Sequence, residues 1–467
     1  MIKFNFTQKI FKFFIFFLLV IPNQIFSQTQ LGADIDGEAA SDLSGYSVST
    51  SSDGTIVAIG AIQNDGTASN AGHVKVYQYS GGTWSQLGAD IDGETASDFS
   101  GHSVSLSADG TILAIGANHN GGTGGNAGHV RVYQYSGGSW SQLGADIDGE
   151  AAGDFSGNSV SLSSDGTKLA VGAAQNDGTA SNAGHVRVYS YSGGSWSQLG
   201  ADIDGEAAGD LFGYSVSLSS DGTKVAIGAV LNDATGLNAG HVRVYSYSGG
   251  SWSQLGADID GEAAGNQSGH SVSLSGDGTI VAIGANANSG AGYASGHVRV
   301  YQYSGSSWSQ LGNDIDGVNP LDQAGRSVSL SSDGTKLAVG GPGNGGTDND
   351  AGHVRIYEYL FGSWRQFSNE IDGEAAGDSF GYSVSLSSDG TKLAVGAVNN
   401  DGSGTSAGHV RVFSLSASFD YTGSKFSQLG SDIDGEAAGD FSGFSVSTSG
   451  DGTKLAVGAI GNDGTGS

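Results

Sequence analysis

The chain has 467 residues, with 47 acidic and 18 basic side chains, a net charge of −29 at pH 7 and no cysteine. The lack of thiols excludes disulfides, zinc–thiolate sites, iron–sulfur clusters and cysteine nucleophiles, and the negative charge disfavours binding to nucleic acid or anionic lipid. Apolar residues form 37% of the sequence and recur at regular intervals, which argues against disorder despite 82 glycines.

Residues 1–28 are predicted to hold a signal peptide, with cleavage expected after Ser27. Three lysines precede an apolar run over residues 13–21, and no acidic residue occurs before Asp34; this order is typical of secretory signals. The run of nine residues is too short for a bilayer span, which needs roughly 18 to 20. We therefore expect a secreted or cell-surface protein of a Gram-negative-like bacterium, with no membrane span in the mature chain.

The remainder of the chain is an internal repeat that begins with Gln-Leu-Gly-Ala-Asp-Ile-Asp-Gly-Glu. Its units start near residues 31, 87, 143, 199, 255, 311, 367 and 429. The spacing is 56 residues six times and then 62, because residues 416–425 lengthen a hairpin turn. Seven units are full, and the eighth stops at Ser467. Residues 29–467 are accordingly expected to form one repeat domain.

Each unit is predicted to contain four short strands, as the third unit shows. Alternating polar and apolar residues predict strands over 158–163 and 168–173, joined by an Asp-Gly turn. A third strand over 185–191 and a fourth over 196–202 are joined by a Gly-Gly turn. No segment shows helical periodicity. In such a unit, both tight turns lie on one face and both longer connections on the other.

Four antiparallel strands in a repeat of this length indicate an all-β fold, a β-propeller of seven to eight four-stranded blades with the last blade incomplete. One blade cannot bury both of its faces, whereas a ring of blades can. A β-solenoid would show a shorter period. Residues 31–36 resemble a lone fourth strand, and the C-terminus supplies only first and second strands of an eighth blade. Two alternatives follow: the chain is a fragment of an eight-bladed ring, or seven blades close and the ends are surplus.

The repeat resembles the FG-GAP family. The resemblance rests on Phe212-Gly213-Tyr-Ser-Val, the same residues at 380–384, Leu-Ala-Val-Gly-Ala at 169–173 and Val-Gly-Gly-Pro at 339–342, and it covers residues 31–467. It is closest to exported bacterial members and more distant from the integrin α-subunit propeller. The resemblance implies a cell-surface propeller that acts in adhesion or ligand binding, and it does not imply an enzyme.

One departure from the integrin-like pattern concerns calcium. Integrin-like units that bind calcium carry Asp-x-Asp-x-Asp-Gly between the first two strands, whereas this chain has Ser-Ser-Asp-Gly-Thr. The single carboxylates of these turns include Asp165, Asp221, Asp333 and Asp389. One carboxylate cannot supply the six to eight oxygen ligands that calcium takes, so this family site is not expected here.

Carboxylates are instead concentrated in the segment that joins one blade to the next. In Asp202-Ile-Asp204-Gly-Glu206-Ala-Ala-Gly-Asp210 they alternate around a glycine, a pattern that could converge on Ca²⁺. The candidate ligands are Asp90, Asp92, Glu94, Asp98, Asp146, Asp148, Glu150, Asp154, Asp202, Asp204, Glu206 and Asp210. The alternative is that Asp and Gly form the turn and keep the rim soluble.

Two further side chains recur once per blade. Histidines open the third strands at His73, His129, His185, His241, His297, His353 and His409. They are expected to tie neighbouring strands by hydrogen bonds, because one histidine per blade is too far from the next to share a metal. Tryptophans lie at Trp84, Trp140, Trp196, Trp252, Trp308 and Trp364. These are expected to pack between blades, with a platform for sugars as the alternative.

No catalytic constellation is visible, because every candidate Ser, His and Asp belongs to the repeat. Unit six diverges most, and its Arg326 and Arg365 are expected to pair with local acids. We therefore expect a non-catalytic binding or adhesion propeller whose partner is an extracellular protein or carbohydrate, assisted by calcium if the acids bind it. An exported propeller hydrolase or lyase acting on polysaccharide, or a structural spacer of a larger surface protein, are the alternatives.

Overall fold

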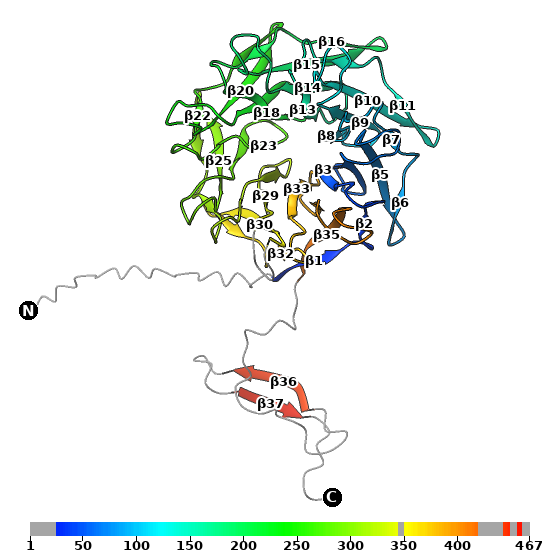
Figure 1. The fold of residues 1–467 in the computed structure, drawn as a ribbon. Helices are drawn as coiled ribbons and strands as arrows, with labels where there is room; N and C mark the ends of the chain where they lie inside the picture. The colour runs from blue at the N-terminus through cyan, green and yellow to red at the C-terminus, as the bar shows by residue number, and fades with distance from the viewer. Residues whose placement is uncertain (1–24, 344–349, 419–441, 449–454, 460–467) are drawn as a thin grey trace, which may run out of the picture. The chain divides into compact units, whose positions relative to one another are not determined.

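Seven antiparallel sheets form a closed ring in the computed structural model, which describes residues 25–343, 350–418, 442–448 and 455–459 (Figure 1). Strands, turns and loops account for all of these residues. Residues 1–24 of the predicted signal peptide, most of the lengthened hairpin turn and the acidic segment of the eighth unit lie outside the described residues. Strands β36 (Ser442–Thr448) and β37 (Leu455–Ala459) form a hairpin in a separate unit, residues 419–467.

The inner two strands of each blade are the predicted first and second strands. The first strands are β3 (Ser44–Thr50), β8 (Ser103–Leu106), β13 (Ser156–Leu162), β18 (Phe212–Leu218), β23 (Ser271–Leu274), β28 (Ser327–Leu330) and β33 (Phe380–Leu386). The second strands are β4 (Ile56–Ala61), β9 (Ile112–Ala117), β14 (Lys168–Ala173), β19 (Lys224–Ala229), β24 (Ile280–Ala285), β29 (Lys336–Gly341) and β34 (Lys392–Ala397).

The third and fourth strands complete each blade. The third strands are β5 (His73–Ser80), β10 (His129–Ser136), β15 (His185–Ser192), β20 (His241–Ser248), β25 (His297–Ser304), β30 (His353–Leu360) and β35 (His409–Ser418). The fourth strands are β6 (Thr83–Gln86), β11 (Ser139–Gln142), β16 (Ser195–Gln198), β21 (Ser251–Gln254), β26 (Ser307–Gln310), β31 (Ser363–Gln366) and β1 (Ile25–Gln30).

The predicted fourth strand is divided in two. A short strand follows each fourth strand and pairs with the same third strand: β7 (Ile91–Asp92), β12 (Ile147–Asp148), β17 (Ile203–Asp204), β22 (Ile259–Asp260), β27 (Ile315–Asp316), β32 (Ile371–Asp372) and β2 (Ile35–Asp36). In the third blade the break falls at Gly200, whose φ of +83° turns the chain. The four-stranded blade is therefore confirmed, with its outer strand interrupted.

The N-terminal strands close the ring. Strand β1 pairs with β35 from Ile25 opposite Ser418 to Gln30 opposite Phe413, and β2 pairs with the same strand. Cleavage after Ser27 would remove the first half of β1 and leave Gln28–Gln30 and β2 on β35. The seventh blade is thus built from both ends of residues 25–418. This closure selects seven blades over eight, and it corrects the expectation that with seven blades the ends are surplus, because the N-terminal segment completes a sheet.

Hydrogen bonds between blades run around the axis as closed circles. Ser52 N–H donates to Ala108 O, and the same bond repeats through Ser164, Ser220, Gly276, Ser332 and Ser388, which donates back to Ser52 O at 2.9 Å. A second circle joins the first serine of each Ser-Val-Ser to a glycine carbonyl of the next blade, as from Ser47 Oγ to Gly101 O at 2.7 Å. The polar alternation of this innermost strand therefore serves contacts between blades.

Paired glycines let adjacent blades approach closely. A Cβ added to Gly116 in β9 would lie 2.1 Å from Gly157 O at the start of β13, and the same contact recurs between all seven neighbouring blades. Both glycines of the Phe-Gly and Ala-Val-Gly-Ala phrases are thus used in one interface. No larger residue fits there, because the neighbouring atom is rigid backbone.

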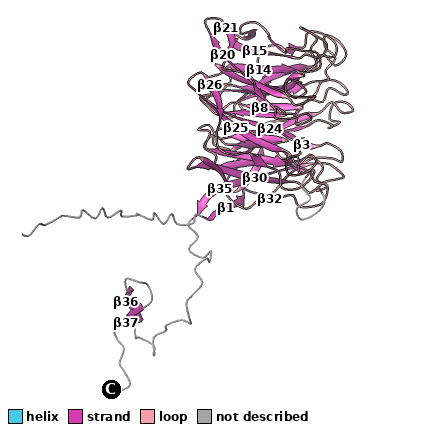
Figure 2. Cartoon of the chain, turned by 90° about the vertical axis from the view of Figure 1, so that its left-hand side faces the viewer, coloured by secondary structure: helices cyan, strands magenta, loops and turns pink. Residues whose placement is uncertain are grey.

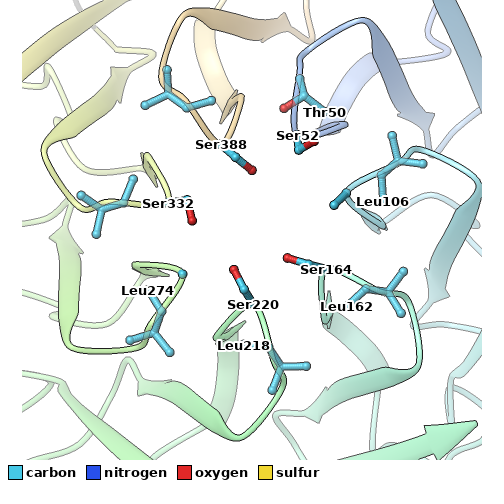
Figure 3. A pocket seen from close by; sticks show the side chains of 14 residues that line it. Thr50, Ser52, Leu106, Leu162, Ser164, Leu218, Ser220, Leu274, Ser332 and Ser388 are labelled. Atoms are coloured by element: carbon cyan, nitrogen blue, oxygen red, sulfur yellow. The ribbon is translucent and has the colours of Figure 1, made fainter.

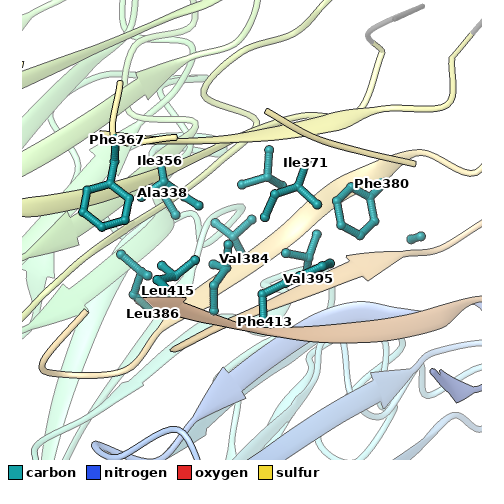
Figure 4. Close-up of a cluster of buried hydrophobic side chains, with 13 residues drawn as sticks. Ala338, Ile356, Phe367, Ile371, Phe380, Val384, Leu386, Val395, Phe413 and Leu415 are labelled. Carbon is teal, nitrogen blue, oxygen red and sulfur yellow. The ribbon is translucent and has the colours of Figure 1, made fainter. Parts of the chain in front are cut away.

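The apolar core lies between blades. In one cluster, Ile356 and Phe367 of the sixth blade pack against Val384, Leu386 and Phe413 of the seventh (Figure 4). The predicted packing of tryptophan between blades is confirmed, because Trp140 contacts the core of the preceding blade and its Nε1–H donates to Leu87 O at 2.7 Å.

The ring presents two different faces. The tight turns between first and second strands and between third and fourth strands lie on one face, which follows from the antiparallel strand order. The longer loops gather on the opposite side of the disc (Figure 2). At the tight-turn end of the axis, a cavity of about 140 Å³ is lined by one pair of residues from each of the seven blades, such as Leu162 and Ser164. Serine hydroxyls point toward its centre (Figure 3).

Candidate functional site

The carboxylate of each Asp-Gly turn is engaged within the turn itself. Asp53 Oδ1 accepts hydrogen bonds from Ser51 Oγ at 2.8 Å, from Thr55 N at 2.9 Å and from Thr55 Oγ1 at 2.8 Å. Partial burial acts to raise the pKa of Asp53, but these bonds outweigh it and the net pKa is lowered. The turn therefore has one carboxylate, and its lone pairs already have local donors.

The acidic segment between the third and fourth blades sends its first two carboxylates to different surroundings. Asp202 accepts two bonds from Arg187 at 2.9 Å, which is the main reason that its pKa is lowered. Asp204 lies on the short strand β17, where burial, followed by the charge of Asp202, raises its pKa. These two carboxylates therefore face different groups despite their close spacing.

The last two carboxylates of the segment are engaged elsewhere again. Glu206 forms an ion pair with Arg243 of the next blade. Asp210 is only 4% exposed and accepts hydrogen bonds from Ala207 N at 3.3 Å and from Asn232 Nδ2 at 2.9 Å. The four acids of one segment do not converge on one point.

The two preceding segments repeat this division. The first acids, Asp90 and Asp146, accept hydrogen bonds from Gln86 and Gln142, and the second acids, Asp92 and Asp148, lie on the short strands. The third acids, Glu94 and Glu150, form ion pairs with Arg131 and Arg187. The last acids, Asp98 and Asp154, are buried and accept hydrogen bonds from Asn120 and Asn176. The candidate ligands are thus all located near the blade interfaces, but each set is distributed over four local sites.

The structure instead joins acids of two successive segments with a third-strand histidine. Glu150 and Asp202 both lie 3.9 Å from Nδ1 of His185, a distance longer than a hydrogen bond. Equivalent groups are Glu38, His73 and Asp90; Glu94, His129 and Asp146; and Glu206, His241 and Asp258. Burial lowers the pKa of His185, and Arg187 lowers it further. Because Arg187 pairs with both acids, its positive charge already offsets part of the negative charge of this group.

Calcium binding remains a prediction, and a melting experiment tests it. Millimolar calcium should raise the melting temperature more than sodium chloride of equal ionic strength, since a cation bound only by the folded state stabilises it. Replacing Asp202, Asp204 and Glu206 by Asn, Asn and Gln should reduce the increment, while Asp177→Asn outside the segment should not. Equal effects of the two salts would contradict calcium binding.

One position that differs between repeats lies on the propeller axis. Within the constant phrase Gly-x-Ser-Val-Ser, the variable residue differs from blade to blade; we call these residues the axial ring, which consists of Tyr46, His102, Asn158, Tyr214, His270, Arg326 and Tyr382. All seven are half-buried. They follow the long loops, at the opposite end of the first strands from the serine-lined cavity.

Each member of the axial ring contacts the next. The contacts are Tyr46 Oη to His102 Nε2 at 3.3 Å, His102 Nδ1 to Asn158 O at 3.1 Å, Asn158 Nδ2 to Tyr214 O at 3.0 Å, Tyr214 Oη to His270 Nε2 at 3.4 Å, Arg326 Nη1 to His270 Nε2 at 2.9 Å, Arg326 Nη2 to Tyr382 Oη at 2.5 Å, and the rings of Tyr382 and Tyr46 at 5.1 Å. The ring is therefore continuous around the axis.

The expectation that Arg326 and Arg365 pair with acids is wrong for the described residues. Arg326 donates to His270 and Tyr382, and its guanidinium lies 4.4 Å from the ring centroid of Tyr382. Arg365 bonds to Ser363 Oγ at 3.4 Å and lies over Phe361. The sequence marked unit six as divergent but could not show that residues 56 apart meet on the axis. The signal that could have found the ring is the variable position inside a constant phrase.

Acid should destabilise the fold through the axial histidines. Burial lowers the pKa of His102 to about 4 and that of His270 to about 3, the latter with help from Arg326. Between pH 6.5, near the pKa of an unfolded histidine, and about 4, the unfolded chain binds protons that the folded chain excludes. Stability should therefore be full above pH 6.5 and fall on acidification, as urea unfolding at pH 7, 5.5 and 4.5 would measure.

A double variant isolates the axial contribution. His102→Asn with His270→Asn introduces the side chain that the ring already carries at position 158. The pH dependence should become shallower but persist, because burial also lowers the pKa of the third-strand histidines, such as His73 and His129. An unchanged slope would show that the axial histidines do not control it.

Sequence and structure comparisons identify the repeat and the fold. The FG-GAP repeat family matches residues 202–245 and 372–413. No curated protein matches the sequence. Among the residues that the structure describes, no helix is long and apolar enough to cross a membrane.

Two similar solved structures share the architecture at low sequence identity. One is a putative 6-phosphogluconolactonase from Bacteroides uniformis ATCC 8492, with a TM-score of 0.50, 12% identity, and coverage of 71% of this chain and 86% of that chain. The other is a hydrazine synthase from Kuenenia stuttgartiensis, with a TM-score of 0.50, 13% identity, and coverage of 79% and 94%. At this identity the likeness shows the fold alone.

Proposed function

Because the chain is a seven-bladed β-propeller of FG-GAP repeats, we propose that it is an exported, non-catalytic binding protein, secreted or held at the cell surface. Its partner is an extracellular protein or carbohydrate, engaged through the face that carries the long loops. Loops held on a rigid scaffold are where propellers and related folds commonly place recognition residues.

The observation that carries this proposal is an apolar patch on the long loops of the fifth and sixth blades. Tyr293, Val318 and Leu321 are 77%, 59% and 48% exposed, and Leu321 N–H donates to Tyr293 O at 2.8 Å. In the third unit the corresponding residues are Ser181, Glu150 and Gly153. Exposed apolar residues that replace polar and small ones in a repeat favour a contact surface.

The patch also changes the local charge. The glutamate that Val318 replaces pairs in other blades with the arginine of the next third strand, as Glu206 does with Arg243. Arg355, at that position in the sixth blade, forms its ion pair with Glu370 alone among the described residues. Arg355 is only 7% exposed, so the surface of the patch is formed by the three apolar side chains. This supports recognition of a ligand with an apolar group.

The repetition of reactive side chains supports binding over catalysis. The His, Glu and Asp groups recur in successive blades, and where an arginine or lysine lies beside them it pairs with the same acids. An enzyme site normally requires one blade to differ in its reactive groups. The patch of the fifth and sixth blades differs by apolar substitution instead. A polysaccharide hydrolase or lyase remains the alternative from another class.

The experiment compares two variants that restore the repeat. Tyr293→Ser, Val318→Glu and Leu321→Gly together convert the patch to the residues of the third unit, and Leu360→Ser with Phe361→Gly does the same at a tight turn on the other face. Both should fold, since Leu321 and Phe361 have positive φ values that suit glycine. The purified proteins are applied to arrays of glycans and extracellular proteins.

The expected result is that the patch variant loses at least tenfold in signal on the array spots that bind the wild type, whereas the tight-turn variant retains its binding. Equal binding by all three proteins would show that the long-loop patch is not the contact surface. Release of new reducing or unsaturated ends from a panel of polysaccharides would instead favour the hydrolase or lyase. Fusion of residues 1–28 to a reporter tests export separately.

A further inference from the structure

We propose that the axial ring binds a small oxyanion, the carboxylate or phosphate group of a ligand, with Arg326 as its charged anchor. This site lies on the propeller axis and is separate from the apolar patch of the fifth and sixth blades. It does not depend on that patch being a contact surface.

The first argument is that Arg326 has no counter-charge. Its two hydrogen-bond partners, His270 and Tyr382, are neutral, and no carboxylate pairs with it among the described residues. A guanidinium has five N–H donors, so two bonds leave most of its donor capacity for other groups. By contrast, the arginines of the third strands, such as Arg187, Arg243 and Arg299, each pair with a glutamate.

The second argument is that polar groups surround Arg326 on the axis. The charge of Arg326 acts on two residues of other blades, Tyr46 and His102. Burial raises the pKa of Tyr46, and Arg326 opposes that rise. Burial lowers the pKa of His102, and Arg326 lowers it further. Burial acts to lower the pKa of Arg326, but its charge interactions with Tyr382, Tyr214 and Tyr46 outweigh burial and raise it. The side chains of several blades therefore share one small region.

The third argument is chemical. A half-buried charge without an opposite charge is destabilising, and an anion that enters the region offsets this cost. The planar guanidinium matches the two oxygens of a carboxylate or phosphate, and tyrosine hydroxyls add neutral donors. Because each member of the ring keeps part of its surface exposed, a small group can reach it. The variation at this one position then sets which group fits.

The test uses the wild-type chain and two variants that each remove one arginine from the sixth blade. Arg326→His introduces a side chain that the ring already has at two positions, and Arg365→Ser introduces the residue of the other repeats at an exposed site. Melting temperature and titration calorimetry are measured at pH 7 with sodium acetate, sodium phosphate and sodium chloride at equal ionic strength.

Acetate or phosphate should raise the melting temperature of the wild type and of Arg365→Ser more than chloride does, and Arg326→His should lose at least tenfold in affinity. A response to acetate alone assigns a carboxylate ligand, and a response to phosphate alone assigns a phosphate. Wild-type responses that equal those to chloride, or an unchanged response in Arg326→His, would overturn the proposal. If Arg326→His does not fold, Tyr382→Phe, which removes one hydroxyl donor, should weaken binding instead.

Discussion

Removal of the N-terminal strands should open the ring. In a chain of residues 25–418, deletion of residues 25–36 takes away β1 and β2, the outer strands of the seventh blade. The deletion removes Ile35, which is 5% exposed, and uncovers Phe413 and Leu415 on β35. Loss of one buried isoleucine costs about 2–5 kcal/mol. Strand β35 also loses its hydrogen bonds to β1 and β2. We expect a melting temperature lower by at least about 10 °C, measured by circular dichroism.

The repeat supplies a control for this result. Residues 427–434 read Ser-Gln-Leu-Gly-Ser-Asp-Ile-Asp, nearly the same as the segment that ends at Asp36. A chain of residues 37–467 therefore tests whether this second copy can replace the missing strands and recover stability. If the shortened chain 37–418 melts like 25–418, closure by the N-terminal strands contributes little and the seven-bladed ring is held by contacts between blades alone.

A single methyl group added between the second strand of one blade and the first strand of the next should also reduce the stability of the fold. In Gly116→Ala the new Cβ would lie 2.1 Å from Gly157 O and 2.4 Å from Ser103 Oγ, where backbone cannot move aside. Overpacking of this kind costs on the order of 3 kcal/mol. The expected result is a lower urea midpoint with an unchanged dependence of the unfolding free energy on urea concentration. The substitution lowers stability, but the surface area that unfolding exposes stays the same.

The matched control lies in the same blade. Gly125 has no atom within 4 Å of an added Cβ and no positive φ value. Gly125→Ala should therefore be neutral or slightly stabilising, because alanine restricts the unfolded chain. Similar losses in both variants would mean that the paired glycines are not needed for close approach, and that the Phe-Gly and Gly-Ala phrases recur for another reason.

The local chemistry of the site was only partly readable from sequence. The alternating carboxylates around Glu206 suggested one shared cation, but the strand β17 ends at Asp204 and the chain turns after it, so the regular side-chain alternation of a strand does not extend to Glu206 and Asp210. Asp202 and Glu206 therefore meet arginines of two different blades, while Asp210 turns inward to Asn232. Each of these partners is many residues away or belongs to another unit, so the spacing within one segment could not identify it.

By itself, the sequence determined the blade. The 56-residue period, the Asp-Gly and Gly-Gly turns and the alternation of strands such as β13 and β15 are local signals, because turn conformation and side-chain alternation depend on neighbouring residues. Only the tertiary structure decided that seven blades close through β1 and that Tyr46, His102 and Arg326 meet on the axis. These contacts join residues 56 or more positions apart, and a ring brings them together only when the number of blades and the closing strand are both fixed.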